Sequence, residues 1–360
     1  MNAPDDRAGT TPPEDDGATP LEDDAMTPPP RPGARTRRRR TGALARPLLA
    51  LLCAVIGAGL AVLLARTSVG TASGQRLDQL ILSGAQDHQG RLSHYAELAV
   101  GTVSVPVMAG LLALALVLVL IRRRLTLLLP LALLVVGANV TTQVVKHLVV
   151  TREALGPGIE VTPNSFPSGH TTLAATAMIA VVLASGRLRA LLAPLGVIWT
   201  AAAGVGTLVL GWHRPSDVVG AIVIVAGWTV LVLAIDGLHT RHRLARDATR
   251  PGRGRRRRDA SRAATGPSAE SPTLLDLRTG AADRVVAVLL GLAGLAGVVY
   301  GAIGLAGLGL PLDLQDAAQQ TSSFVATAAL IAGGTASWMA LVLVLRTPTS
   351  HRSSPGDRVP

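Results

Sequence analysis

Long apolar runs separated by short polar segments make up most of the chain. The runs lie at about 47–65, 98–121, 125–145, 171–186, 190–210, 217–235, 285–310 and 324–345. Most of them are close to the roughly 20 residues that an α-helix needs to cross a bilayer. The run at 171–186 reaches that length if its helix begins near Ser168. The pattern therefore predicts an all-α, polytopic membrane protein with one membrane-spanning helix for each run.

The polar segments between these runs predict the domain organisation. In order, we expect a disordered cytoplasmic tail at 1–46, a six-span core at 47–238, a basic cytoplasmic linker at 239–283, a two-span C-terminal appendage at 284–346 and a cytoplasmic tail at 347–360. The first tail begins with Asp, Glu, Pro, Gly and Thr, which cannot bury enough apolar surface to offset the entropy lost on ordering.

A signal peptide is the alternative for this N-terminus. The basic block lies far from Met1 and no convincing cleavage site is present, so we expect the first run to be retained as an anchor.

The last two spans are rich in small residues, including Gly294, Gly297, Gly301 and Gly304. Small residues at such spacing let two helices approach closely within a membrane. Packing alone is the favoured role for these two spans.

Composition supports the membrane class and argues against nucleic-acid binding. Of the 360 residues, 49% are hydrophobic and only 16% are charged, although the formal net charge is +11. The arginines gather at 35–40, 122–124 and 253–258, each beside an apolar run, which is typical of the cytoplasmic ends of membrane spans. With two Phe, two Tyr and four Trp, the chain has few aromatic rings on which bases could stack. The lone cysteine, Cys53, cannot form an intrachain disulfide.

Alternation of the spans predicts their orientation in the cell membrane. The basic segments all fall on one side, which the positive-inside rule assigns to the cytoplasm. The opposite side then receives the segments 66–97, 146–170, 211–216 and 311–323. Segment 66–97 is expected to be a loop and carries no recognisable motif.

The strongest local motif is Pro167-Ser168-Gly169-His170, directly before an apolar helix. Ser168 and Gly169 would place a hydroxyl and unshielded backbone N–H groups at a helix N-terminus, which favours an anion. His170 would stand beside that anion. The alternative is a turn with an N-cap serine and an incidental histidine.

Another motif, running from Gly211 to Asp217, lies at the start of another span on the same side. The i, i+4 spacing lets the Asp217 carboxylate reach the His213 ring if the helix begins here, and Pro215 suits its first turn. A carboxylate that accepts one ring N–H leaves the other ring nitrogen free to act as a nucleophile. An ion pair at a helix start, without chemistry, is the alternative.

Lys146 and Arg152 flank a short loop that precedes the Pro167 motif. Two cations on one loop are commonly solvated surface charges. Beside an anion site, they become candidate phosphate ligands.

Three motifs follow in this order on one membrane face: Lys146 with Arg152 (the first motif), Pro167-Ser168-Gly169-His170 (the second motif) and Gly211 to Asp217 (the third motif). Together they resemble the signature of the type 2 phosphatidic acid phosphatase superfamily. That superfamily includes bacterial polyprenyl-diphosphate phosphatases, and the resemblance covers roughly residues 47–236. It implies that His213 attacks phosphorus, that Asp217 orients His213, and that His170 protonates the leaving group. It also implies a set of residues that hold the phosphate oxygens: Lys146, Arg152, Ser168 and Gly169. Water would hydrolyse the phosphohistidine, with no metal or cofactor.

The chain departs from the family pattern at two positions. Five residues separate Lys146 from Arg152, where the family has six and then Arg-Pro. The family also has an arginine six positions before the third-motif histidine, and this chain has Thr207 there. Arg214 could replace the missing cation, or it could merely meet lipid headgroups at the helix entrance.

The sequence thus predicts a phosphatase that acts on a lipid phosphate or a polyprenyl diphosphate. One alternative is a phosphotransferase that passes the phosphoryl group to a lipid or sugar acceptor. Another is a membrane protein that binds anionic lipid headgroups without catalysis. The expected partner is a membrane lipid substrate, and the pattern leaves the particular lipid and the oligomeric state open.

Overall fold

The computed structural model describes residues 32–157, 159, 163–249 and 280–345. Much of the predicted N-terminal tail, most of the basic linker and the predicted C-terminal tail lie outside the described residues. The chain forms two compact units, residues 1–42 and 43–360. The described part of the first unit is helical, and the second unit holds the helical bundle and the candidate site.

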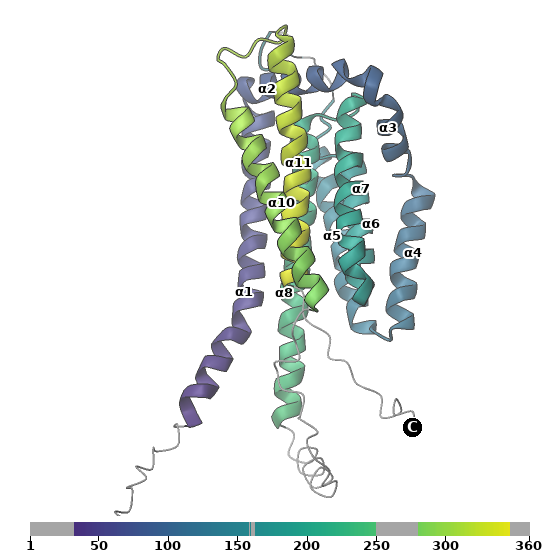
Figure 1. The fold of residues 1–360 in the computed structure, drawn as a ribbon, viewed down its shortest axis with the longest axis vertical. Coiled ribbons are helices and arrows are strands. Elements are labelled where there is room, and N and C mark those ends of the chain that lie inside the picture. Colours follow the sequence, from purple (N-terminus) through teal and green to yellow (C-terminus); the bar gives the residue numbers. More distant parts are fainter. Residues whose placement is uncertain (1–31, 158, 160–162, 250–279, 346–360) are drawn as a thin grey trace, which may run out of the picture. The chain divides into compact units, whose positions relative to one another are not determined.

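The described residues form helices and no strands, which confirms the predicted all-α class. The α-helices are α1 (Pro32–Leu64), α2 (Ala72–Asp87), α3 (Gln89–Gly101), α4 (Val105–Ile121), α5 (Leu128–Val144), α6 (Gly169–Ala184), α7 (Arg189–Val209), α8 (Pro215–Thr249), α10 (Ala281–Ala306) and α11 (Ala317–Leu345). Short 3-10 or π-helical turns are η1 (Ala65–Val69), η2 (Leu125–Leu127), η3 (Val145–Val149) and η4 (Gly186–Leu188). Figure 1 shows the helices of the bundle running side by side.

Six of the described helical segments are long and apolar enough to cross a membrane, as in a multi-pass membrane protein. They are Leu48–Val69, Leu125–Val149, Gly186–Val209, Pro215–Leu238, Ala281–Ala306 and Ala317–Leu345. A bent pair, α3 with α4, passes the same test together, and α6 is a shorter apolar helix. Each predicted run therefore contains helix, but the run at 171–186 forms a helix of only 16 residues and does not reach the predicted spanning length.

The run at 98–121 is not one straight helix as predicted. α3 ends at Gly101, and α4 begins at Val105 with a bend of 51° between the two helices. Pro106 lies in the first turn of α4. Proline lacks a backbone N–H and clashes with a preceding helical turn, so a new helix starts here more readily than an old one continues.

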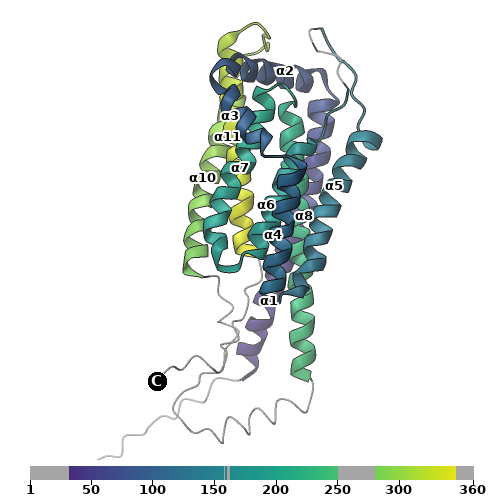
Figure 2. The same cartoon turned by 90° about the vertical axis from the view of Figure 1, so that its right-hand side faces the viewer.

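Segment 66–97 is also not the loop that the sequence predicts. It contains α2, which lies across one end of the bundle, and most of α3 (Figures 1 and 2). The Thr71 side chain caps α2 by accepting a hydrogen bond from the Gly74 N–H at 3.0 Å. Gln75, Asp78 and Leu82 recur at helical spacing on its buried face. Polar residues alternate with apolar ones at helical spacing in this segment, so it contains no continuous apolar run.

The centre of the bundle is formed by α5, α6, α7, α8 and α11. Leu134 of α5, Ile179 of α6 and Met339 of α11 are fully buried there. α11 packs on α7, α8 and α2, so the predicted C-terminal appendage contributes directly to the central core. The domain boundaries themselves stay a prediction.

The glycine pattern does bring α10 and α11 together, which confirms the predicted close packing. A Cβ atom added at Gly333 would lie 2.6 Å from the Val298 backbone nitrogen and 2.7 Å from the Gly294 carbonyl oxygen. A Cβ at Gly301 would lie 2.4 Å from the Ala326 carbonyl oxygen. Backbones this close leave no room for a side chain between them.

Two helices extend across predicted domain boundaries. α1 begins at Pro32, inside the segment expected to be a disordered tail, and α8 continues to Thr249, beyond the expected end of the core at 238. Both extensions are rich in arginine and contain alanine, which are favourable helix formers.

The arginine-rich turns between α4 and α5 and between α6 and α7 lie at the end of the bundle opposite the starts of α6 and α8. There the Arg189 Nε donates to the Asp283 Oδ2 at 2.7 Å, and both side chains are buried. This ion pair joins the first turn of α7 to the first turn of α10. The Arg122 guanidinium packs against Gly186 at the same end.

Candidate active site

Asn164 ties the loop after η3 to the turn before α6. Its Nδ2 donates to the carbonyl oxygens of Lys146 at 2.9 Å and Val150 at 2.7 Å. Its Oδ1 accepts the Phe166 N–H at 3.1 Å. One side chain therefore sets the position of the first motif relative to the second.

The second motif forms the start of α6 in the predicted manner. Ser168 is the N-cap residue, and its Oγ accepts hydrogen bonds from the Thr171 N–H at 3.3 Å and the Thr171 hydroxyl at 3.0 Å. Ser168 is fully buried, whereas Gly169 is half-buried and His170 is exposed. The Ser168 hydroxyl thus supports the helix start, and its predicted contact with phosphate stays a prediction.

The third motif is held by the residue that replaces the family arginine. The Thr207 carbonyl oxygen accepts the N–H groups of Trp212 at 2.9 Å and His213 at 3.2 Å. The Thr207 hydroxyl donates to the Gly204 carbonyl at 2.7 Å, so it is occupied within its own helix. Gly211 makes the turn with a φ of 72°, a conformation that favours glycine.

His213 and Asp217 face each other as the spacing predicts. The distance from His213 Nδ1 to Asp217 Oδ2 is 3.6 Å, and the exposed fractions of the two side chains are 8% and 0%. The Asp217 carboxylate also accepts the Ser165 hydroxyl and, at 2.8 Å, the Arg214 N–H. These donors hold the carboxylate in place. Because Nδ1 faces Asp217, Nε2 is the ring nitrogen left for a substrate.

His170 lies beside this pair. The ring centroids of His170 and His213 are 5.9 Å apart, and those of His170 and Trp212 are 5.7 Å apart. The Ser168 N–H donates to the Asp217 carbonyl at 2.9 Å, which joins the starts of α6 and α8. The two histidines therefore approach one small volume, His170 from the first turn of α6 and His213 from the turn before α8.

Lys146 also reaches this volume. It lies in η3, a π-helical turn, and is half-buried. Desolvation lowers the pKa of His170, and electrostatic interactions with the neighbouring His213 and Lys146 side chains lower it further. Irregular turns of this kind occur often at functional sites, and here the turn ends α5 beside the second motif.

Arg152 has a buried side chain, with an exposed fraction of 3%. Its Nη2 lies 3.5 Å from the Asp78 Oδ2, while Nε and Nη1 have no hydrogen-bond partner among the described residues. Asp78 in turn accepts the Ser216 N–H at 3.2 Å and the Ser216 hydroxyl. Ser216 precedes Asp217, so a chain of contacts links Arg152 to the third motif.

Arg214 is buried, with 5% of its surface exposed. This burial argues against the alternative in which Arg214 merely meets lipid headgroups at the surface. Arg214 lies beside His213 in sequence, and its own N–H binds Asp217.

Asp78, Asn164, Gln75 and Ser165 were not among the residues that the sequence predicts for the site. Polar residues of these types are common, and no local sequence signal separates these four from their neighbours. Asp87, on the same helix as Asp78, is exposed. Only long-range contacts distinguish the two carboxylates.

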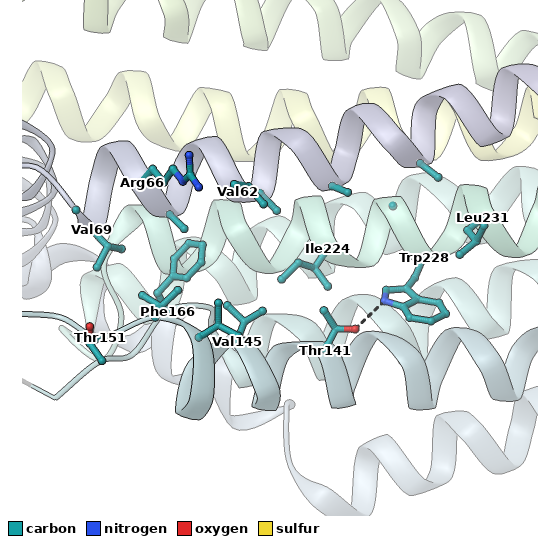
Figure 3. A pocket seen from close by; sticks show the side chains of 18 residues that line it. Val62, Arg66, Val69, Thr141, Val145, Thr151, Phe166, Ile224, Trp228 and Leu231 are labelled. Atoms are coloured by element: carbon teal, nitrogen blue, oxygen red, sulfur yellow. Dashed lines mark hydrogen bonds between the residues drawn. The ribbon is translucent and has the colours of Figure 1, made fainter.

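An apolar cavity of about 770 Å³ lies between α1, α5 and α8. Figure 3 shows Val69, Thr151 and Phe166 toward one end of it and Trp228 and Leu231 toward the other. The first end adjoins the site, because Thr151 precedes Arg152 and Phe166 precedes the second motif.

The lining of the cavity is suited to hydrocarbon. Among its polar side chains, the Trp228 Nε1 donates to the Thr141 hydroxyl at 3.0 Å, which satisfies the indole inside the bundle. Arg66, near the site end, is exposed and places a cation there. α1 comes close to α8 at Gly57, where an added Cβ would lie 3.4 Å from the Gly227 Cα, but most of the side chains between Leu48 and Leu64 are exposed.

Comparison with known families identifies the segment that carries the motifs. Residues 127–241 match the family model described as the PAP2 superfamily. The segment that carries the motifs is therefore similar to the PAP2 superfamily, in a chain with several helices that could cross a membrane. This match confirms the resemblance that the sequence predicts, and it includes both histidines of the site, Asp217 and both predicted cations of the first motif. The comparisons with curated proteins and with solved structures gave no match.

Members of the PAP2 superfamily are generally phosphatases, which agrees with the roles that the sequence predicts for His213 and the neighbouring cations. α2, α10 and α11 lie outside the matched segment. Asp78 therefore belongs to a part of the chain that the family model does not cover.

The Asp78 carboxyl generates a prediction about stability. Burial raises its pKa from an ordinary value of 3.8 to about 6, and repulsion from Asp217 adds to the rise, although Ser216 and Arg152 oppose it. An acid whose pKa is raised by folding destabilises the folded state once it is ionised. This cost is absent below about pH 4, grows as the pH rises through 6, and remains in full above that.

We therefore expect Asp78→Asn to remove one component of the pH dependence of stability. The stability of the variant relative to the unchanged protein should increase by up to about 3 kcal/mol between pH 4 and 7, the equivalent of a pKa shift of about two units. Thermal unfolding in detergent across this range measures the difference, with the exposed Asp87→Asn as the control. Parallel profiles for the protein and Asp78→Asn would contradict the raised pKa.

Proposed function

We propose that the protein is an integral membrane phosphatase that hydrolyses a lipid phosphate or a polyprenyl diphosphate through a phosphohistidine on His213. The observation that carries the proposal is the convergence of His213, with Asp217 behind it, and His170 at one end of the bundle. The buried Arg152 and the nearby Lys146 supply positive charge for phosphate. The reaction requires no metal ion.

In the first step, the free Nε2 of His213 attacks phosphorus and the bond from phosphorus to the leaving oxygen breaks. His170 gives its proton to that oxygen, which leaves as the lipid alcohol or the lipid monophosphate. Asp217 stabilises the positive charge that develops on the His213 ring, because Nδ1 faces its carboxylate. The separation of 3.6 Å is expected to shorten when substrate binds.

In the second step, water attacks the phosphohistidine and the bond between phosphorus and nitrogen breaks. His170 now accepts a proton from that water, which restores the starting state and releases inorganic phosphate. A phosphotransferase would differ only in the nucleophile of this step. Formation of a second phosphorylated product when an acceptor alcohol is added would reveal such transfer.

The apolar cavity supports a substrate with a long hydrocarbon chain. Its volume of about 770 Å³ lies between helices long enough to cross a membrane, and one end adjoins the site. A lipid tail in this cavity would place its phosphate beside the motifs without leaving an apolar environment.

The first test is loss of the proposed nucleophile. His213→Ala should lower phosphate release by at least about 10³-fold, since the covalent step loses its attacking atom. Purified protein would be assayed with phosphatidic acid, phosphatidylglycerol phosphate, and polyprenyl mono- and diphosphates, with and without a chelator. His94→Ala, an exposed histidine of α3, is the matched control. Full activity of His213→Ala, or strict dependence on a divalent ion, would refute the mechanism.

Arg214 is proposed to supply the cation that Thr207 lacks. Arg214→Ala should then lower kcat/KM by on the order of 10²-fold, the scale of deleting one preorganised donor. Thr207→Arg should partly restore activity to that variant. A double-mutant cycle on the two positions decides the matter, since independent effects would remove Arg214 from the phosphate site.

The site is proposed to face away from the cytoplasm in the cell membrane. The Arg122 and Arg189 turns lie at the opposite end of the bundle, where the positive-inside rule expects the cytoplasm. In a Cys53→Ser background, Asp87→Cys should react with an impermeant thiol reagent in intact cells, and Arg123→Cys only after lysis. The reverse labelling pattern would invert the orientation.

A further inference from the structure

Asp78 lies at the junction of two site segments that are far apart in sequence. From the buried face of α2 it contacts Arg152 of the first motif at 3.5 Å and Ser216 of the third motif through both carboxylate oxygens. Its side chain is 5% exposed. A buried carboxylate is costly unless its partners compensate for lost water, so these contacts also define where α2 can sit.

Gln75, one turn earlier on α2, fixes the backbone next to Arg152. Its Nε2 donates to the Glu153 carbonyl at 2.7 Å, and its Oε1 accepts the Leu155 N–H at 3.1 Å. Nε2 also donates to the Val69 carbonyl at 2.7 Å, at the end of η1. α2 therefore holds both the side chain of Arg152 and the loop backbone that follows it.

The Arg152 guanidinium has binding capacity that these contacts leave unused. Asp78 engages Nη2, whereas Nε and Nη1 are buried and have no partner within the described ranges. Each of these N–H groups can donate a charge-assisted hydrogen bond to a phosphate oxygen. Two buried, unsatisfied donors on one guanidinium point to an anionic ligand.

We propose that Asp78 is a positioning residue of the phosphate site, which holds the Arg152 guanidinium so that its Nε and Nη1 can bind phosphate oxygens. This inference rests on the proposed function, because it assigns Asp78 a place in the same site. Asp78 itself does not touch the substrate. It acts through Arg152 and keeps Arg152 in register with the start of α8 through Ser216.

Asparagine at position 78 provides a selective test. Its Oδ1 can still accept the Ser216 N–H, and its amide can donate to the Ser216 hydroxyl oxygen, so the contact with α8 is preserved. The amide has no charge to attract Arg152 and turns donor hydrogens toward it. Asp78→Asn therefore releases Arg152 and leaves the bundle joined.

The experiment compares Asp78→Asn, Arg152→Gln and the double variant in the full-length protein. Binding of inorganic phosphate is measured directly by titration calorimetry in detergent, and KM and kcat are measured with the lipid that the unchanged protein hydrolyses. Each single variant should weaken phosphate binding by about tenfold, as expected for loss of a charge-assisted hydrogen bond, and should raise KM more than it lowers kcat. The double variant should bind phosphate no more weakly than Arg152→Gln alone. Asp87→Asn should match the unchanged protein.

Three results would overturn the proposal. The first is multiplication of the two single effects in the double variant, which would mean that Asp78 acts independently of Arg152. The second is unchanged phosphate affinity in folded Asp78→Asn, which would make Asp78 a purely structural residue. The third is unchanged affinity in Arg152→Gln, which would remove Arg152 from the phosphate site.

A second variant keeps the test decisive if Asp78→Asn does not fold. Ser216→Ala removes the hydroxyl that orients the Asp78 Oδ2 and keeps both charges. It should weaken phosphate binding by about threefold, a fraction of a typical hydrogen-bond contribution, and only while Arg152 is present. Unchanged affinity in Ser216→Ala would overturn the proposal.

Failure of this inference can be told apart from failure of the proposed function. If no lipid is hydrolysed but phosphate binding depends on Arg152 and Asp78 in the coupled manner, the inference stands without the activity. If phosphate release depends on His213 but the Asp78 variants bind phosphate normally, the activity stands and the inference is overturned.

Discussion

The buried Asp217 carboxylate is the constraint on which the site depends. It accepts the Ser165 hydroxyl and the Arg214 N–H, and it faces the His213 ring. The backbone of the same residue accepts the Ser168 N–H. One residue thus fixes the His213 ring, the turn before α6 and the start of α8. A charge buried this deeply is tolerated because its donors compensate for the loss of water.

A second layer of support comes from outside the segment that matches the family. α2 reaches the site through Asp78 and Gln75, and its other side packs on α11. At Gly84 the two helices approach so closely that an added Cβ would lie 2.1 Å from the Gln320 carbonyl oxygen. α11 therefore supports α2, the helix that holds Arg152, and is also part of the central core.

The membrane explains why polar chemistry and apolar packing are separated along the bundle. Where helices meet lipid, exposed leucine and valine side chains such as those of α1 are stable, and backbone groups are satisfied within each helix. Ionisable residues are costly at membrane depth, so the cations and carboxylates gather at the two ends. The apolar cavity beside Phe166 connects these two environments, since one of its ends adjoins the motifs.

The sequence alone determined the helical class, the apolar segments and the three motifs. These features are local: the length of an apolar run, a capping serine before a helix, and a histidine four positions before an aspartate all act within a few turns. The prediction of a loop at 66–97 was wrong, because the buried face of α2 carries polar side chains whose partners are distant in the chain. The contact of Asp78 with Ser216 spans 138 positions, and that of Arg152 with Asp78 spans 74. Only the tertiary structure could decide that Asp78 is buried and Asp87 exposed, because burial of a carboxylate depends on which distant donors the fold brings to it.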